Sequence, residues 1–415
     1  MNDFPADFLW GSSTAAHQVE GGNTNNDWWD WEHAPGTKAT ESSGDAIDQW
    51  HRYPDDFALL ASLGQNAHRF SLEWSRIEPA EGEFSRAALD HYRRVLASLR
   101  HNDLTPFTTL YHFTLPRWFA KRGGWLAEDA LDIFTRYVQR VAAALGDELS
   151  YVGTINEPQV LSAMGYLTGS FPPGMQDRDT AIRVNRLLAE AHRRAVGVLR
   201  AGPGRPQIGT CLQIAPAEPF RPGDEADIAL ADRLRVYNEE THIEDLRAAE
   251  DPGDFVGLQY YSRLRVDARN PAMQADLPEG TEVSQMGWEV YPEGFAQALT
   301  SVASSGLPVL VTENGIATAD DSQRVRYLAS HLEVLQRARE TGVDVRGYFH
   351  WSAFDNFEWS HGYGPTFGLI GVERDNGFRR VVKASAVLYG EVARTGSLQA
   401  LRRAASGDGN GPGAA

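Results

Sequence analysis

Short apolar, β-prone runs alternate with longer amphipathic stretches along this chain. Each run is rich in Val, Ile, Phe, Tyr and Thr and contains little charge. The runs are Phe8–Ser13, Asn66–Leu72, Pro106–His112, Tyr151–Asn156, Gln207–Ile214, Phe255–Ser262, Pro308–Glu313 and Arg346–Trp351. Continuous apolar runs are typical of parallel strands that are covered on both faces. The pattern therefore predicts eight buried parallel strands.

The segments between these runs have the spacing of amphipathic helices. In Arg86–Arg100, apolar side chains recur every three or four residues, and the same spacing occurs in Ala130–Leu145, Thr180–Leu199 and Ser322–Thr341. Strands that alternate with helices predict right-handed βαβ units around a parallel sheet. Eight such units favour an α/β fold with a single (β/α)8 TIM barrel over an open sheet.

Three stretches rich in Gly, Pro and Asp follow strand ends, at Gly21–Gln49, Met164–Asp179 and Arg263–Trp288. In a barrel, such long βα-loops lie at the catalytic face. No linker divides the chain, so residues 1–403 are predicted to form one domain. The segment 404–415 (AASGDGNGPGAA) has no apolar period and is predicted to be a disordered tail.

The charge of the chain narrows its partners. With 39 Lys and Arg against 56 Asp and Glu, the net charge is −17. Nucleic acids and anionic membranes need a basic surface, so neither is expected as a partner. The oligomeric state is left open.

Features typical of membrane or secreted proteins are not expected in this chain. No apolar stretch approaches about 18 residues, so no membrane span is expected. Met1–Trp10 lacks a basic start followed by an apolar stretch, so no signal peptide is expected. Cys211 is the single cysteine, which excludes an intrachain disulfide, and its strand neighbours predict a buried thiol. A cytoplasmic protein is the simplest interpretation.

Two glutamates stand at the ends of predicted strands. Glu157 follows the fourth run and precedes Pro158, and Glu313 ends the seventh run, two residues before Gly315. Parallel barrel strands would bring both carboxyl groups to one rim. Hydrolysis of a glycosidic bond with retention needs two such groups about 5–5.5 Å apart, one protonated and one ionised. Either residue alone could be an ordinary acidic strand end. The repeated pattern of strand, Asn, Glu and turn-former favours a catalytic pair.

Six ordered motifs resemble glycoside hydrolase family 1. They are FLWGSSTAAHQVEG (Phe8–Gly21), HRFSLEWSRI (His68–Ile77), TLYHFTLP (Thr109–Pro116), TINEP, VTENG and WSAFDNFEW (Trp351–Trp359). The resemblance runs from about Phe8 to Val392 and implies a (β/α)8 barrel and a retaining β-glycosidase.

The resemblance also implies roles for individual residues. Glu157 would be the acid/base and Glu313 the nucleophile. Asn156 would hold the sugar 2-hydroxyl, Arg69 would keep Glu313 ionised, and Tyr261 would donate a hydrogen bond to it. Other residues of the motifs would bind the glycone, the sugar that is transferred: Gln18, His112, Trp351, Glu358, Trp359, Gln259 and Phe367.

The chain departs from the family pattern at two positions, Gln259 and Phe113. Gln259 stands where an Asn usually precedes the paired tyrosines, and Phe113 stands where a Trp is usual. The segment after Glu358 lacks the Lys of the branch that acts on 6-phosphoglycosides, and a carboxylate there would repel a phosphate. A neutral glycone is therefore expected.

The expected activity is hydrolysis of β-D-glucosides, with galactosides and fucosides as further substrates. Transfer to an acceptor alcohol in place of water, and a non-catalytic sugar-binding barrel, are the alternatives. No metal site and no organic cofactor are expected, because no His/Cys cluster or glycine loop has the required spacing. Four aromatic residues either bind an apolar aglycone, the leaving group of the substrate, or pack within loops: Phe113, Phe171, Trp288 and Phe354.

Overall fold

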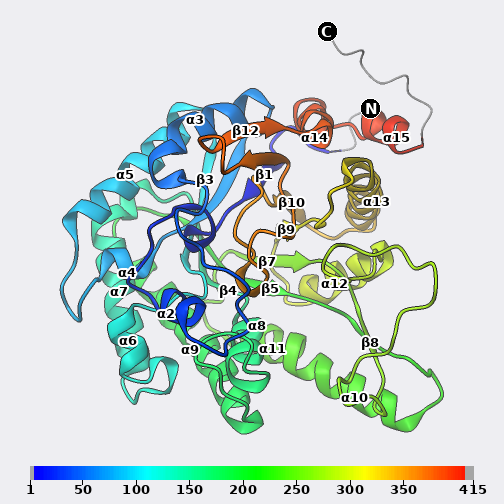
Figure 1. Ribbon diagram of the computed structural model, residues 1–415, viewed down its shortest axis with the longest axis horizontal. Coiled ribbons are helices and arrows are strands. Elements are labelled where there is room, and N and C mark those ends of the chain that lie inside the picture. Colours follow the sequence, from blue (N-terminus) through cyan, green and yellow to red (C-terminus); the bar gives the residue numbers. More distant parts are fainter. Residues whose placement is uncertain (1–3, 407–415) are drawn as a thin grey trace.

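A closed barrel of eight parallel strands forms the centre of the computed structural model, which describes residues 4–406 (Figure 1). The barrel strands are β1 (Leu9–Ser13), β2 (Ala67–Ser71), β3 (Thr105–Tyr111), β4 (Tyr151–Asn156), β5 (Gln207–Gln213), β7 (Phe255–Tyr260), β9 (Val309–Asn314) and β10 (Val345–Trp351). Each strand pairs with its neighbour in the chain, and β10 closes the barrel on β1 from Leu9 opposite Gly347 to Ser13 opposite Trp351. The predicted (β/α)8 TIM barrel and its eight strands are therefore confirmed.

Helices surround this barrel. The larger ones are α3 (Gln49–Ser62), α5 (Arg86–His101), α7 (Ala130–Leu145), α9 (Arg178–Ala201), α11 (Thr241–Ala248), α12 (Pro292–Ala303), α13 (Asp321–Glu340) and α14 (Ala384–Thr395). Four of them, α5, α7, α9 and α13, match the predicted helices to within two residues at each end. Side-chain caps set the starts of α5 and α9: Ser85 accepts from the backbone N–H of Ala88 in α5, and Asp177 accepts from that of Thr180 in α9.

Short elements occupy the long βα-loops. They are α1 (Ala16–Val19), α2 (Asp27–His33), α4 (Trp74–Ile77), α6 (Arg117–Lys121), α8 (Pro158–Ser162) and the π-helical turn η3 (Ala163–Leu167). The loop predicted at Gly21–Gln49 thus contains α2, whose first turn is capped by the Asn26 side chain. The loops predicted at Met164–Asp179 and Arg263–Trp288 contain η3 and a short strand, β8 (Leu264–Val266).

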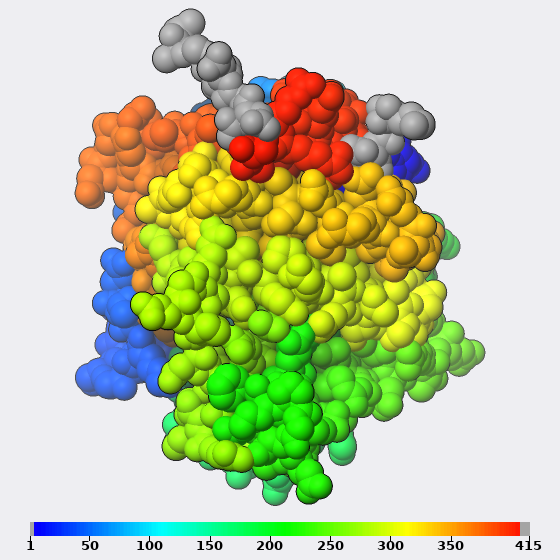
Figure 2. All heavy atoms as spheres, turned by 90° about the vertical axis from the view of Figure 1, so that its right-hand side faces the viewer, coloured from blue at the N-terminus to red at the C-terminus, as the bar shows by residue number. Residues whose placement is uncertain are grey.

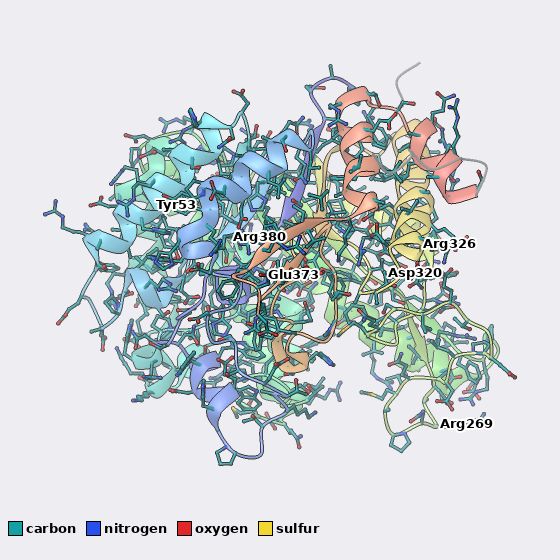
Figure 3. The ribbon with its side chains drawn as sticks, turned by 45° about the horizontal axis from the view of Figure 1, so that its top comes forward. Tyr53, Arg269, Asp320, Arg326, Glu373 and Arg380 are labelled. Carbon is teal, nitrogen blue, oxygen red and sulfur yellow. The ribbon has the colours of Figure 1, made fainter. Side chains whose placement is uncertain are left out.

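An outer lobe projects from one side of the barrel (Figure 1). It consists of β6 (Ala217–Pro219), β8 and α10 (Glu225–Arg235), and it lies below the band formed by α12 and α13 in Figure 2. Arg221 ties its segments together through Asp227 at 2.7 Å and Asp267 at 2.5 Å. Figure 3 shows Arg269 at the outer end of this lobe, on the other side of the molecule from Tyr53.

A β-hairpin, β11 (Ile370–Glu373) and β12 (Arg379–Val382), packs over α3. Arg380 of this hairpin reaches the buried carboxylate of Asp56 in α3 at 2.7 Å (Figure 3). The chain then forms α14 and α15 (Gln399–Ser406), which lie beside the first described residues (Figure 1). The backbone N–H of Phe4 donates to Gly396 there.

The barrel interior has an apolar lower layer and a polar upper layer. The lower layer is closed by Ala67, Phe107, Cys211, Phe255, Leu310 and Phe349. Cys211 is a buried free thiol, as its strand neighbours predict. Above this plug, near the carboxyl ends of the strands, the inward side chains become charged and polar. The fold therefore holds a polar cluster on a rigid apolar floor.

The predicted domain boundary falls near the end of the described chain. Residues 404–406 belong to α15, so the segment predicted to be disordered begins within a helix, and residues 407–415 lie outside the described residues. Among residues 4–406, no helix is long and apolar enough to cross a membrane. The cytoplasmic location stays a prediction.

Candidate active site

Glu313 lies at the carboxyl end of β9 and is surrounded by hydrogen-bond donors. Arg69 Nη1 and Gln259 Nε2 each lie 2.5 Å from its Oε1, and the Tyr261 hydroxyl lies 2.5 Å from its Oε2. The pKa of the Glu313 carboxyl is raised overall, because burial outweighs the Arg69 charge and the hydrogen bonds from Tyr261 and Arg69, which lower it. Three donors on a buried carboxyl are what an ionised form requires. The site is therefore built to hold Glu313 as a carboxylate.

Glu157 follows β4 directly and faces the same rim. Its backbone has a φ of 44°, in the left-handed region, and its N–H donates to the Cys211 carbonyl at 2.8 Å. Pro158 then begins α8, where a missing N–H costs nothing. The Glu157 side chain has no hydrogen-bond or ion-pair partner within the part of the chain that the structure describes.

The environment of Glu157 favours its protonated form. Burial raises the pKa of the Glu157 carboxyl well above its ordinary value, and the charge of Glu313 raises it further. Arg69 opposes this shift only in part. The two carboxyl groups titrate as a coupled pair. Glu313 loses its proton first, because three donors stabilise its carboxylate, and the remaining proton stays on Glu157. One acid and one carboxylate thus share the rim at neutral pH.

The Asn156 amide contacts two of the residues that donate to Glu313, and it also contacts His112. Its Oδ1 accepts from Arg69 Nη2 at 2.5 Å and from Gln259 Nε2 at 2.8 Å. Its Nδ2 lies 3.3 Å from His112 Nε2. Since the oxygen is occupied by two donors, the Asn156 amide can rotate only at the loss of both bonds. The NH2 group is therefore turned toward His112 and keeps a second hydrogen to donate.

Residues from three distant loops form the rest of the pocket. Gln18, on α1, donates from Nε2 to the Phe357 carbonyl at 2.8 Å and to Asn356 at 3.2 Å. The His112 ring stacks in near-parallel orientation against Trp351 and Trp359, with centroids 6.2 and 6.0 Å away. The structure thus brings together side chains that are up to about 340 residues apart in the sequence.

Three buried polar atoms of this pocket have no partner. They are Gln18 Oε1, His112 Nδ1 and Gln259 Oε1. An unsatisfied buried polar atom costs free energy unless a ligand or water completes it. Burial also lowers the pKa of His112 well below its ordinary value, so its ring is neutral and can donate from one nitrogen and accept at the other. These atoms suit a ligand that carries several hydroxyl groups.

Glu358 brings a third carboxyl group to the site. It lies 3.5 Å from Gln18 Nε2, and burial, with the charge of Glu313, raises its pKa to about 8. At neutral pH this group is therefore mostly protonated and can both donate and accept. The repulsion of a phosphate that the sequence suggested is strong only at higher pH, so the lack of Lys and Arg in residues 358–367 is the better argument for a neutral glycone.

Phe367 forms an aromatic wall with residues from other loops. It is buried against Trp351, and its ring centroid lies 6.0 Å from Tyr261 and 6.3 Å from Trp288. A direct contact of Phe367 with the glycone stays a prediction.

The four aromatic residues considered for the aglycone differ in how deeply they are buried. Phe354 is fully buried in the core between barrel and helices, which is ordinary packing. Phe113 and Phe171 are also buried and pack on Trp359, with centroids at 5.3 and 6.2 Å. Trp288 alone of the four is exposed, at 36%. Trp288 is therefore the one of them that offers a free aromatic face at the rim.

Two supporting residues were missed by the sequence analysis. Thr109 accepts from Arg69 Nε at 3.1 Å and so fixes the guanidinium. It points into the barrel like Phe107, two residues earlier, so strand alternation could have identified it. Asn356 positions Gln18 across 338 residues of chain, and no local pattern announces that contact. His17, the neighbour of Gln18 on α1, is buried and contacts Asn23 and Asn26.

No group of three or more His, Cys, Asp and Glu side chains within residues 4–406 has an arrangement that could hold a metal ion. The expected absence of a cofactor stays a prediction.

Comparisons with known proteins agree with this geometry. The model of "Glycosyl hydrolase family 1" matches residues 1–246 and 239–397. A solved β-glycosidase from Pyrococcus horikoshii is 37% identical, covers 98% of this chain and 99% of its own, and superimposes with a TM-score of 0.88. A Thermotoga maritima β-glucosidase solved in complex with glucoimidazole is 32% identical over 95% of this chain and 99% of its own, with a TM-score of 0.89. A bifunctional β-D-glucosidase/β-D-fucosidase of Bifidobacterium breve is 31% identical over 90% of this chain and 94% of its own length.

Proposed function

Because this chain belongs to glycosyl hydrolase family 1, we propose that it is a retaining β-glycosidase that hydrolyses β-D-glucosides, with galactosides and fucosides as further substrates. The observation that carries the proposal is the unequal pair of carboxyl groups. Glu313 accepts from three donors, whereas Glu157 is buried without one. This difference assigns attack to Glu313 and proton donation to Glu157.

In the first step, a carboxylate oxygen of Glu313 attacks the anomeric carbon. The bond from that carbon to the glycosidic oxygen breaks, its electron pair moves to the oxygen, and Glu157 delivers its proton there. The products are an alcohol and a glycosyl ester of Glu313. Arg69 and Tyr261, which stabilised the carboxylate, then contact a neutral ester.

In the second step, water attacks the same carbon from the side that the alcohol left. Loss of the charge on Glu313 removes the main charge that held the Glu157 proton, so the pKa of Glu157 falls and it accepts a proton from water. The ester bond breaks and its electron pair returns to Glu313, where Arg69, Gln259 and Tyr261 stabilise it. Two inversions give net retention.

The glycone would occupy the space between the two glutamates and the buried polar atoms of Gln18, His112 and Gln259 that have no partner within residues 4–406. Gln18 and Glu358 can bind two neighbouring hydroxyl groups, and His112 can bind a third through Nδ1. Trp351 and Trp359 offer flat apolar faces that suit a pyranose ring. The family pattern and the absence of a cation in residues 358–367 support a neutral sugar.

For the aglycone, the exposed Trp288 beside Tyr261 supports an aryl or other apolar group. Transfer to an acceptor alcohol would use the same glycosyl ester, so product analysis with added alcohol separates it from hydrolysis. The complete pair of glutamates, with Asn156 and Arg69, argues against a non-catalytic sugar-binding barrel.

The stereochemical outcome tests the proposal directly. When 4-nitrophenyl β-D-glucoside is hydrolysed in D2O, the β-anomer of glucose is expected to appear first in the ¹H NMR spectrum, with the α-anomer growing later by mutarotation. Initial release of the α-anomer would mean a single displacement and would overturn the proposal. Absence of turnover would favour the non-catalytic alternative.

The pH profile of kcat/KM on the same substrate is expected to be bell-shaped. Glu157 must be protonated, and because its pKa is raised, activity should persist well above the ordinary range of a glutamic acid before it falls. Glu313 must be ionised, so the acid limb reports its pKa, which the Tyr261 hydrogen bond lowers. The Tyr261→Phe variant should therefore move the acid limb upward by about one pH unit.

The alkaline limb serves as the internal control for that measurement, because Tyr261 makes no hydrogen bond to Glu157. A Tyr261→Phe profile with an unmoved acid limb would contradict the assignment of that limb to Glu313.

A further inference from the structure

Gln259 occupies a position where this chain departs from its family, and its side chain points into the barrel. It stands near the end of β7, in register with Gln213 of β5 and Glu313 of β9, and is fully buried. Two residues earlier on the same face, Gly257 has no side chain, and a Cβ there would meet Cys211 Sγ and Thr312 at 3.0 Å. Gln259 therefore lies directly above the apolar floor, at the level of the reacting groups.

The orientation of the Gln259 amide is set by its neighbours. Its Nε2 lies 2.5 Å from Glu313 Oε1 and 2.8 Å from Asn156 Oδ1. Both partners are acceptors, and Asn156 Oδ1 is itself fixed by Arg69. A rotated amide would place Oε1 against two oxygens, which is repulsive. The NH2 group must therefore face Glu313 and Asn156, and the oxygen must face away from them.

This orientation leaves Gln259 Oε1 buried and without a partner. The NH2 group of Asn156, whose oxygen is held by two donors, lies 3.3 Å from His112 Nε2 and has a second hydrogen to donate. Gln259 and Asn156, whose amides contact each other through Nε2 and Oδ1, thus offer one acceptor and one donor beside the nucleophile. A hydroxyl group is the ligand that accepts from one and donates to the other.

We propose that Gln259 is a specificity-determining residue that reads the 2-hydroxyl of the glycone together with Asn156. Asn156 Nδ2 donates to the oxygen of this hydroxyl, and the hydroxyl hydrogen is donated to Gln259 Oε1. This inference rests on the proposed function.

The position of Gln259 selects this hydroxyl. The two heteroatoms of an amide are about 2.3 Å apart, so Gln259 Oε1 lies within about 5 Å of the Glu313 oxygen that its NH2 group contacts. Glu313 attacks C1, and C2 is the adjacent ring carbon that carries a hydroxyl. Gln18 and Glu358 would bind the hydroxyl groups on the opposite side of the ring. Removal of the 2-hydroxyl would leave Gln259 Oε1 and one N–H hydrogen of Asn156 unpaired, which is how a polar site rejects a deoxy analogue.

The test compares 4-nitrophenyl β-D-glucoside with its 2-deoxy and 6-deoxy analogues in wild type, Gln259→Met and Gln213→Met. Met keeps the approximate length of Gln without its donors and acceptor. In the wild type, the 2-deoxy substrate is expected to have a kcat/KM lower by about 10³-fold or more. In Gln259→Met, this ratio should shrink at least about tenfold, while the 6-deoxy ratio stays unchanged.

Gln213→Met is the matched control, since Gln213 is the same residue type at the same register on the neighbouring strand, and neither ratio should change there. Cooperative unfolding on heating shows whether Gln259→Met is folded, and if it is not, Gln259→Asn is measured instead. The amide oxygen of Asn lies one methylene further from the hydroxyl, so the 2-deoxy ratio should again shrink. Equal loss on the 2-hydroxy and 2-deoxy substrates would overturn the inference and leave Gln259 as a support for Glu313 and Asn156. No turnover of any glucoside by the wild type would refute the proposed function instead.

Discussion

Replacement of Glu313 by glycine is expected to lower kcat on aryl β-glucosides by about 10⁵-fold or more, the largest effect of any single change in this chain. The reason is geometric. Glu313 is the group that three donors hold as a carboxylate, and no other carboxylate within residues 4–406 shares these donors. Steady-state rates on 4-nitrophenyl β-D-glucoside measure the loss.

Azide identifies the role that was lost. A small anion can occupy the space that the missing side chain leaves and attack the anomeric carbon once, so the Glu313→Gly variant with azide should yield the α-glucosyl azide. The exposed Glu279→Gly is the control and should behave as the wild type. A Glu313→Gly variant that folds and keeps more than about a hundredth of the activity would disprove the nucleophile assignment.

Glu157→Ala is expected to lose activity in proportion to the need of the leaving group for a proton. On glucosides with poor leaving groups, kcat/KM should fall by about 10³–10⁴-fold. With 2,4-dinitrophenyl β-D-glucoside, whose leaving group departs without a proton, the first step should stay fast. The second step lacks its base, so a burst of phenolate followed by slow turnover is expected in stopped-flow traces.

Azide again separates the roles, with the opposite product. In Glu157→Ala it should attack the glycosyl ester of Glu313 and give the β-glucosyl azide. Equal losses on good and poor leaving groups would show that Glu157 does not act as the acid. The two variants are thus expected to give opposite anomers of the glucosyl azide from one site, which no purely structural role would produce.

Much of the site could be located from the sequence because its residues stand at strand ends. The strand-like runs that finish at Asn156 and Glu313 are long enough to predict parallel strands, and parallel strands must deliver their carboxyl ends to one rim. The family motifs added Arg69, Tyr261 and the glycone residues. In the structure, these side chains converge on Glu313 and its neighbours. Their individual roles stay predictions until the variants are measured.

Other features depend on contacts that no local pattern encodes. Phe354 and Trp288 are both large aromatic residues in loops after strands, yet one is fully buried and the other is exposed. The helices α3 and α12 were not predicted: neither begins at a side-chain cap, and α3 contains Pro54. The partners of Gln18 likewise come from the far end of the chain.

The sequence by itself determined the barrel, its order of strands and the rim on which two glutamates meet. Hydrophobic periodicity identifies each strand from its own residues, and parallel strands place all their carboxyl ends at one rim. The tertiary structure alone decided which glutamate is surrounded by donors and which is left without one. That difference arises from Arg69, Gln259 and Tyr261 on other strands and loops, since a buried carboxyl takes its charge state from neighbours in space and not from neighbours in sequence.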